Sequence, residues 1–204
     1  MAAIEIHPAT PERWPDLERL FGPNGANSGC WCMWWRLKRS DWDQARGAGA
    51  KTMLKRLVKR GAPPPGLLAY AQGECVGWCA LAPRAEYPVL DRSRNLAPVD
   101  DEPVWSITCF FIKRGWRRKG ITRALIRGAI DAAREAGAPV LEAYPWDPHG
   151  EKSSGTVFTG LASTFERLGF REVARRAPQR PILRLALNRG GSRAARPHPN
   201  PRAD

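Results

Sequence analysis

No stretch of this 204-residue sequence approaches the roughly 20 consecutive apolar residues that a membrane-spanning helix needs. The N-terminal segment also lacks the basic and then apolar order of a secretory signal peptide. These two absences predict a cytoplasmic protein without a membrane segment.

Histidine is scarce, with 3 residues, and the cysteines are odd in number, with 5. An odd count without an export signal predicts free thiols rather than a disulfide framework. Cys30 and Cys32 lie close enough in sequence to suggest metal ligands, but the histidines supply no second pair at the spacing of a structural zinc site. We therefore expect no metal.

Acidic residues are few relative to basic ones. The sequence has 20 Asp and Glu and 33 Lys and Arg, which gives a formal net charge of +13. A surplus of positive charge attracts polyanions. Nucleic acid, an acidic membrane surface and a phosphate-bearing cofactor all fit this charge. The charge alone does not choose among them.

The apolar content, 43% of the residues, is sufficient for one core, and the length is that of one domain. The end of the chain differs, because residues 188–204 are mostly Gly, Pro, Arg and Ala, with almost nothing to bury. We therefore expect a single domain over residues 1–187 and a disordered basic tail over residues 188–204.

Alternation and helical spacing predict an ordered series of strands and helices. The clearest element is VWSITCFFI at 104–112, whose β-branched and aromatic residues are typical of a buried central strand. A helix at 121–137 and a second core strand at 140–144 follow it. The other expected elements are a strand at 4–7, helices at 10–21, 40–60 and 156–168, a hairpin at 67–71 and 74–81, a polar loop at 83–103, and strands at 170–175 and 182–187.

A basic turn joins the strand at 104–112 to the helix at 121–137. Its residues are Arg117, Arg118, Lys119, Gly120, Ile121, Thr122 and Arg123. A helix N-terminus offers unpaired amide donors and the positive end of the helix dipole, and glycine lets the backbone close around a phosphate. The pattern therefore predicts a phosphate-binding turn, with a solvated basic helix start as the alternative.

The turn resembles the acyl-CoA pyrophosphate signature of the GNAT superfamily of N-acetyltransferases, R/Q-x-x-G-x-G/A, with Arg117, Gly120 and Thr122 at the three positions. Thr122 stands where the family prefers glycine or alanine. The run LLAYAQGECVGWCALAP at 67–83 is similar to the family's hairpin, and FERLGF at 165–170 to its C-terminal tyrosine-x-x-x-Gly-Phe box. The resemblance implies an α/β fold, with a mixed, mostly antiparallel sheet, splayed central parallel strands and flanking helices.

The resemblance also implies acetyl-CoA as the co-substrate. The backbone of Phe110, Phe111 and Ile112 would then pair with the pantetheine, and the turn residues from Arg117 to Arg123 would hold the pyrophosphate. The family's usual acid, the tyrosine of the box, is replaced by Phe165, so a hydroxyl such as Ser163 would have to substitute. For the base, Glu102 and Glu142 are candidates, with surface carboxylates as the alternative interpretation.

Aromatic residues supply the candidates for the acceptor site. Trp31, Trp34 and Trp35 form the densest cluster, and they are either an aromatic wall for an amine or ordinary core packing between two helices. Tyr144 and Trp146 follow the strand at 140–144, where the loops of open sheets gather ligands.

These features together predict an N-acetyltransferase that moves an acetyl group from acetyl-CoA to a primary amine, expected to be that of a small molecule, by direct attack. A homodimer is compatible with the sequence, whereas a membrane partner is not expected and nucleic acid is disfavoured. Two alternatives stay open, a basic nucleic-acid-binding protein and a catalytically degenerate GNAT-like protein that binds or senses CoA. The first predicts binding that weakens steeply with salt, and the second predicts cofactor binding without turnover.

Overall fold

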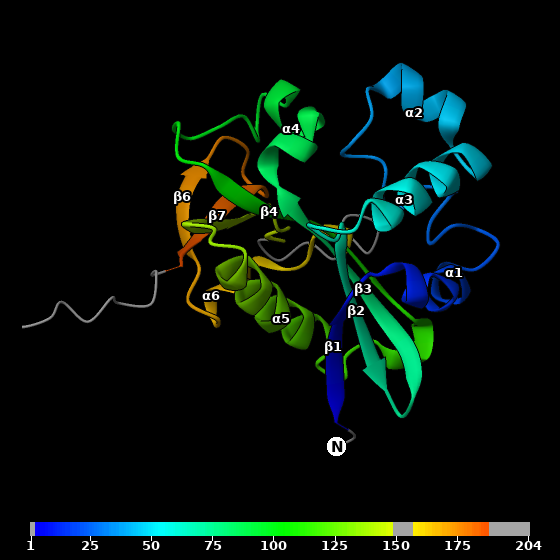
Figure 1. The fold of residues 1–204 in the computed structure, drawn as a ribbon. Helices are drawn as coiled ribbons and strands as arrows, with labels where there is room; N and C mark the ends of the chain where they lie inside the picture. The colour runs from blue at the N-terminus through cyan, green and yellow to red at the C-terminus, as the bar shows by residue number, and fades with distance from the viewer. Residues whose placement is uncertain (1–2, 149–156, 188–204) are drawn as a thin grey trace, which may run out of the picture.

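The computed structural model describes residues 3–148 and 157–187 (Figure 1). The predicted tail at 188–204 lies outside these residues. One mixed sheet forms the centre of the molecule, and helices cover both of its faces.

The sheet has seven strands in the order β1-β2-β3-β4-β5-β7-β6. Their bounds are β1 Ile4–Pro8, β2 Gly66–Ala71, β3 Glu74–Pro83, β4 Val104–Ile112, β5 Val140–Ala143, β6 Arg171–Arg175 and β7 Pro181–Ala186. All neighbouring pairs are antiparallel except β4 and β5, which are parallel. The expected fold class, a mostly antiparallel sheet with central parallel strands, is confirmed.

The described helices are α1 Trp14–Phe21, α2 Arg39–Ala45, α3 Ala48–Arg60, α4 Pro88–Arg92, α5 Ile121–Glu135 and α6 Ala162–Glu166. Two of the expected helices and one expected loop differ from the sequence expectation. The helix expected at 40–60 is divided into α2 and α3, because Gly47 has a φ of 89° that a continuous helix excludes. The helix expected at 156–168 is shortened, because Gly160, at a φ of 83°, precedes the start of α6. The expected loop at 83–103 also contains α4.

Strand residues alternate between the two faces of the sheet. Leu67, Ala69 and Leu81 pack with α5, while Leu68 and Ala80 pack with α1 and α3. The long helix α5 crosses one face with its buried residues at helical spacing, as the sequence predicts. Gly77 in β3 permits this close approach, because a Cβ there would lie 2.7 Å from the side chain of Ile121.

The two parallel strands separate part of the way along β4. Residues 104–107 of β4 pair with residues 140–143 of β5, and β5 then ends. β4 continues to Ile112 with its other edge paired to β3. The pairing with β3 shifts where Ile107 and Cys109 face Leu81 and Ala80, so Thr108 has no partner in the register. Among residues 3–148 and 157–187, no strand therefore pairs with the β5-facing edge of the second half of β4, beside the N-terminus of α5.

Candidate functional site

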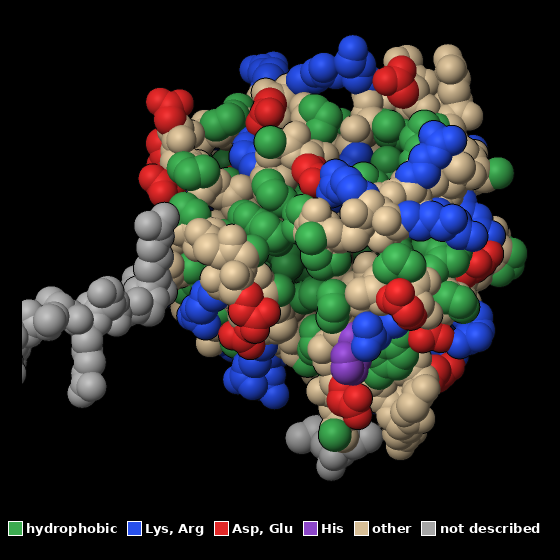
Figure 2. Space-filling view, in the orientation of Figure 1, with side chains coloured by type: hydrophobic (Ala, Val, Ile, Leu, Met, Phe, Trp, Pro, Cys, Tyr) green, Lys and Arg blue, Asp and Glu red, His purple; other side chains and the backbone are tan. Residues whose placement is uncertain are grey.

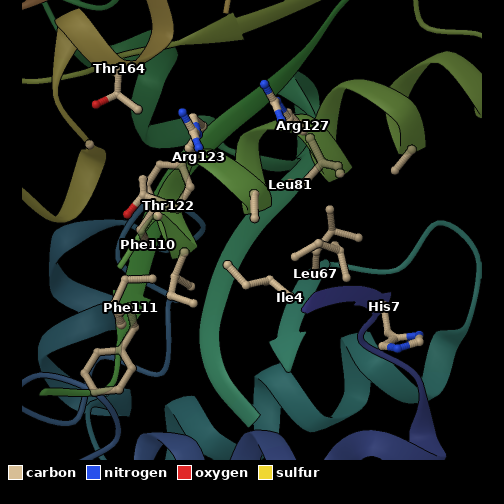
Figure 3. A pocket seen from close by; sticks show the side chains of 18 of the residues that line it. Ile4, His7, Leu67, Leu81, Phe110, Phe111, Thr122, Arg123, Arg127 and Thr164 are labelled. Atoms are coloured by element: carbon tan, nitrogen blue, oxygen red, sulfur yellow. The ribbon is translucent and has the colours of Figure 1, made fainter. Parts of the chain in front are cut away.

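A groove of about 2230 Å³ runs along α5 and the second half of β4. Figure 3 shows Phe110 and Phe111 of β4, Thr122 and Arg123 of α5 and Thr164 of α6 around it, with Arg127 further along α5. The segment 157–161 also lines the groove through Val157, Phe158, Gly160 and Leu161, and Gly160 lies close to the Phe110 ring. All the residues of the expected phosphate-binding turn line this groove, as do Phe110, Phe111 and Ile112.

The turn before α5 has the backbone of an anion-binding loop. Arg118 and Gly120 both have positive φ angles, 62° and 82°, and Gly120 is left-handed at the N-cap of α5. The first helical hydrogen bond is donated by the Ala124 amide to the Gly120 carbonyl at 3.0 Å. The amides of Ile121, Thr122 and Arg123 therefore lack helical acceptors. These donors, together with the helix dipole, fit a pyrophosphate.

Basic side chains surround the turn, but one of them is already neutralised. Lys113 forms an ion pair with Glu74 at the hairpin turn, and the indole of Trp116 donates to the same carboxylate at 3.3 Å. The contact with Glu74 was not foreseen, because the two residues are far apart in sequence. Lys119 lies over the ring of Trp116, 4.9 Å from its centroid. The groove itself is lined by Arg117, Arg118, Lys119, Arg123 and Arg127.

Phe165, in the position of the family's tyrosine, is fully buried. Its ring centroid lies 6.1 Å from that of Phe110 and 5.1 Å from that of Phe170. Ser163 is exposed on α6 and does not line the groove, whereas Thr164 does. The sequence predicted Ser163 rather than its neighbour Thr164 as the hydroxyl at the site. The direction of a helical side chain depends on where the helix begins, which the sequence did not show. The start of α6 is set by the turn at Gly160.

Glu142 lies away from the groove, on the opposite face of the sheet. Its carboxylate is fully buried and accepts hydrogen bonds from Arg84 Nη1 at 2.8 Å and from Arg184 Nε at 2.6 Å. The Tyr144 hydroxyl donates to it at 2.5 Å, and Ser106 Oγ lies 2.9 Å from that hydroxyl. The carboxylate is thus occupied by two guanidinium groups and a phenol, which does not support the predicted role as a base.

Glu102 is exposed in the segment before β4, where its amide donates to Asp100 Oδ1 at 3.1 Å. Asp100 in turn pairs with Arg184 at 2.7 Å. Glu102 is not among the residues that line the groove. The structure therefore brings neither predicted acid to the groove.

The three tryptophans near the N-terminus do not line the groove either. Trp31 is 4% exposed and stacks on Trp14 with ring centroids 6.0 Å apart. Trp35 is buried in a separate cluster that includes Tyr87 and Tyr144. Trp34 packs edge-on against Trp42 at 5.0 Å. Trp31 and Trp35 are therefore packed in the core, the alternative left open by the sequence, whereas Trp34 is partly exposed.

Tyr144 is buried, as described above, whereas Trp146 is partly exposed. The backbone of Trp146 pairs with the segment opposite it: its amide donates to the Gly160 carbonyl at 2.8 Å, and its carbonyl accepts from the Ala162 amide at 3.0 Å. Arg180, which sequence analysis did not single out, lies over the Trp146 ring at 5.3 Å. Only the pairing of distant segments brings Arg180 to this place.

The cysteines are all free. Cys32 and Cys109 are neighbours, with their sulfur atoms 3.5 Å apart, although they are separated by most of the N-terminal half of the chain. Over residues 3–148 and 157–187, no group of three or more His, Cys, Asp or Glu side chains is arranged to hold a metal ion. Within the same residues, no helix is long and apolar enough to cross a membrane.

Comparison with known proteins shows the family. The family model "Acetyltransferase (GNAT) family" matches residues 31–151, more than half of the chain. No curated protein matches this chain.

Solved structures share the fold at low sequence identity. The PaiA N-acetyltransferase of Thermoplasma acidophilum in complex with coenzyme A is 15% identical, with a TM-score of 0.53 over 90% of this chain and 99% of its own. A putative GNAT acetyltransferase of Desulfovibrio desulfuricans is 15% identical, with a TM-score of 0.53 over 91% of this chain and 100% of its own. A histone acetyltransferase HPA2 and related acetyltransferase of Corynebacterium glutamicum is 17% identical, with a TM-score of 0.52 over 90% and 96%. The family match, together with the shared fold, establishes that this chain belongs to the GNAT acetyltransferase family.

Proposed function

We propose that the protein transfers the acetyl group of acetyl-CoA to the primary amine of a small molecule, by direct attack of the amine on the thioester. Membership of an acetyltransferase family supports acetyl-CoA as the co-substrate, and the similar Thermoplasma protein is a complex with coenzyme A. A homodimer and a cytoplasmic location stay predictions.

This proposal rests on one observation: the part of β4 that is not paired with β5 and the N-terminus of α5 line the same groove. The pyrophosphate would be held by the free amides of Ile121, Thr122 and Arg123 and by the basic side chains beside them. The pantetheine would lie along Phe110 to Ile112, where β4 no longer pairs with β5. Both groups would occupy the same groove.

Thr164 is the hydroxyl best placed to assist the leaving thiolate. It lines the groove on α6, beside the buried Phe165. A hydroxyl can donate a hydrogen bond to the departing sulfur without a full proton transfer, and a CoA thiol is acidic enough to leave as the anion. We propose this role for Thr164 in place of Ser163.

A catalytically degenerate member of the family is the second candidate. It is favoured by the positions of Glu102 and Glu142, neither of which lines the groove. Such a protein would bind acetyl-CoA and release no thiol with any amine.

Thermal unfolding with acetyl-CoA, with ATP as a phosphate control, at two salt concentrations tests the proposal. A ligand that binds only the folded state raises its stability by about 2.7 kcal/mol at a hundredfold excess over the dissociation constant. We expect stabilisation by acetyl-CoA alone, with mild salt dependence. Equal stabilisation by both ligands that decreases with salt would instead indicate a basic patch. The nucleic-acid-binding alternative would then be favoured. Thiol release with a panel of amines then separates the enzyme from the degenerate protein.

A further inference from the structure

Arg180 is a partly buried guanidinium without a carboxylate. Among the described residues it forms no ion pair, whereas the neighbouring strand and loop arginines Arg84, Arg175 and Arg184 are each paired with acids. Burial lowers the pKa of Arg180, and no acidic group within residues 3–148 and 157–187 offsets this effect. A desolvated cation without an anion is costly to a fold, which suggests that its anion comes from a ligand.

The guanidinium is held on one side only. Arg180 Nη1 donates to Thr159 Oγ1 at 2.9 Å and to the Tyr144 carbonyl at 3.3 Å, and the group lies over the ring of Trp146. Nε and Nη2 make no hydrogen bond in the described part of the chain. These two nitrogens form the fork that binds a carboxylate with two parallel hydrogen bonds. The fixed nitrogen and the stacked ring therefore leave a preorganised anion-binding edge.

A second unused donor lies against the same group. Within the described part of the chain, Trp146 Nε1 is buried without a hydrogen-bond partner, as are the indole nitrogens of Trp14, Trp35, Trp42 and Trp78. Buried donors are nearly always paired in native proteins, so an orphan beside an unpaired cation points to a missing acceptor. The two observations are independent, because one concerns charge and the other concerns hydrogen bonding.

The position of Arg180 connects it to the groove. Tyr144 directly follows the last residue of β5 that pairs with β4, so its carbonyl lies just past the point where the two strands separate. Thr159 precedes Gly160, which lines the groove and is so close to β4 that a Cβ there would lie 3.2 Å from the Phe110 ring. Arg180 therefore contacts Thr159, the neighbour of Gly160, and Gly160 lines the groove beside the expected path of the pantetheine.

We infer that Arg180 binds a carboxylate of the acceptor, so that the substrate class is an amine that also carries a carboxyl group. This inference rests on the proposed acetyl transfer and specifies its acceptor. A planar carboxylate fits the free Nε and Nη2 edge, and a carboxamide, which is neutral and offers only one acceptor oxygen, does not. Arg180 then determines specificity, and the acetyl transfer itself does not require it.

The test uses pairs of amines that differ only in this group, namely β-alanine with β-alaninamide and 4-aminobutyrate with 4-aminobutyramide. Release of the CoA thiol gives kcat/KM, compared at equal concentrations of the unprotonated amine. The full-length protein is compared with Arg180→Met and Arg180→Lys. Arg176→Met is the matched control, because Arg176 lies in the same loop, is exposed and contacts only the carbonyls of Ala97 and Pro98.

We expect the wild type and Arg176→Met to prefer each acid over its amide by at least tenfold. Arg180→Met should lose this preference while the thermal shift with acetyl-CoA is unchanged, and Arg180→Lys should keep only part of it. If Arg180→Met is merely less stable and retains the preference, Arg180 is structural and the inference is wrong. If the wild type acetylates acids and amides equally, the inference is also wrong, and the acetyltransferase proposal survives.

A binding measurement covers the case in which no amine of the panel is acetylated. Thermal unfolding with and without acetyl-CoA is then repeated with each acid and each amide. Stabilisation by the acids only, lost in Arg180→Met, supports the carboxylate site. Equal effects of acids and amides overturn it. Absence of any shift with acetyl-CoA would count against the proposed function alone, since the acid and amide comparison is read separately.

Discussion

Arg84 Nη1 donates to the buried Glu142 carboxylate at 2.8 Å, and Arg84 directly follows β3 in the chain whereas Glu142 lies in β5. Arg184 holds the other oxygen of the same carboxylate at 2.6 Å. Glu142 thus links β5 to β7 and to the segment after β3. The arrangement indicates a structural role for this carboxylate.

Replacing Glu142 by glutamine should therefore affect stability. The change removes the buried carboxylate between Arg84 and Arg184 and leaves them only the half-exposed acids Asp91 and Asp100. Because breaking a buried pair costs about 3–5 kcal/mol of unfolding free energy, the loss should approach that range. Asp43→Asn, which removes an exposed pair with Arg39, should cost less than about 1 kcal/mol. Urea denaturation of both variants measures the difference. Similar small losses would contradict the role assigned to Glu142.

A double variant tests the proposed phosphate-binding role of the turn before α5. Arg118→Glu with Gly120→Asp places anions against the expected pyrophosphate and puts a side chain at a left-handed φ of 82°. Acetyl-CoA binding, followed by calorimetry, should be abolished. The matched control is Arg134→Glu, at the other end of α5, which should bind normally. Unchanged affinity of the double variant would refute the site.

Thr164 and Ser163 form a pair of neighbours with different expected effects. Thr164→Val removes the hydroxyl that lines the groove and should lower kcat about tenfold, a modest loss for an acid that assists a good leaving group. Ser163→Ala should leave kcat unchanged, because Ser163 is exposed away from the groove. Steady-state kinetics with the best amine of the panel decides the matter. Equal effects of the two changes would remove Thr164 from the mechanism.

A substitution of Trp31 distinguishes the two interpretations of the tryptophans, core packing and a wall of the acceptor site. Trp31→Ala should lower the free energy of unfolding by about 3–5 kcal/mol, because the ring is buried against Trp14 and Phe21. Trp34→Ala, a partly exposed neighbour, should lose clearly less. Denaturation curves provide the comparison. A stable Trp31→Ala protein with a raised KM for amines would instead support the wall.

Stability should fall at alkaline pH through Tyr87. Burial raises the pKa of its hydroxyl to about 12, above the ordinary value near 10. Between these values the unfolded chain has lost a proton that the folded protein keeps, so the free energy of unfolding decreases as pH rises, by about 1.4 kcal/mol per pKa unit. Denaturation curves at pH 9 and pH 12 give the decrease in the free energy of unfolding between the two pH values. This decrease should be about 2–3 kcal/mol smaller in Tyr87→Phe than in the wild type. An equal drop in both proteins would rule out this source.

The order of the strands and the turn at residues 117–122 could be predicted because their signals are local. β-Branched residues mark β4, apolar spacing marks α5, and a glycine at the helix start marks the anion-binding turn. These signals depend on neighbours within a few positions, so they identified the family resemblance and the cofactor groove. The family resemblance, rather than a local signal, implied that Phe110 to Ile112 bind the cofactor, and these residues line the groove.

The sequence by itself predicted the sheet, the position of the basic turn at residues 117–123 and the family. Only the tertiary structure decided which side chains reach the groove: Thr164 rather than Ser163, and neither Glu142 nor Trp31. It also placed Arg180 on Trp146, at the separation of β4 from β5. The physical reason is that a side chain's direction depends on helix starts, strand register and the packing of segments far apart in the chain, and no local pattern of residues encodes these distances.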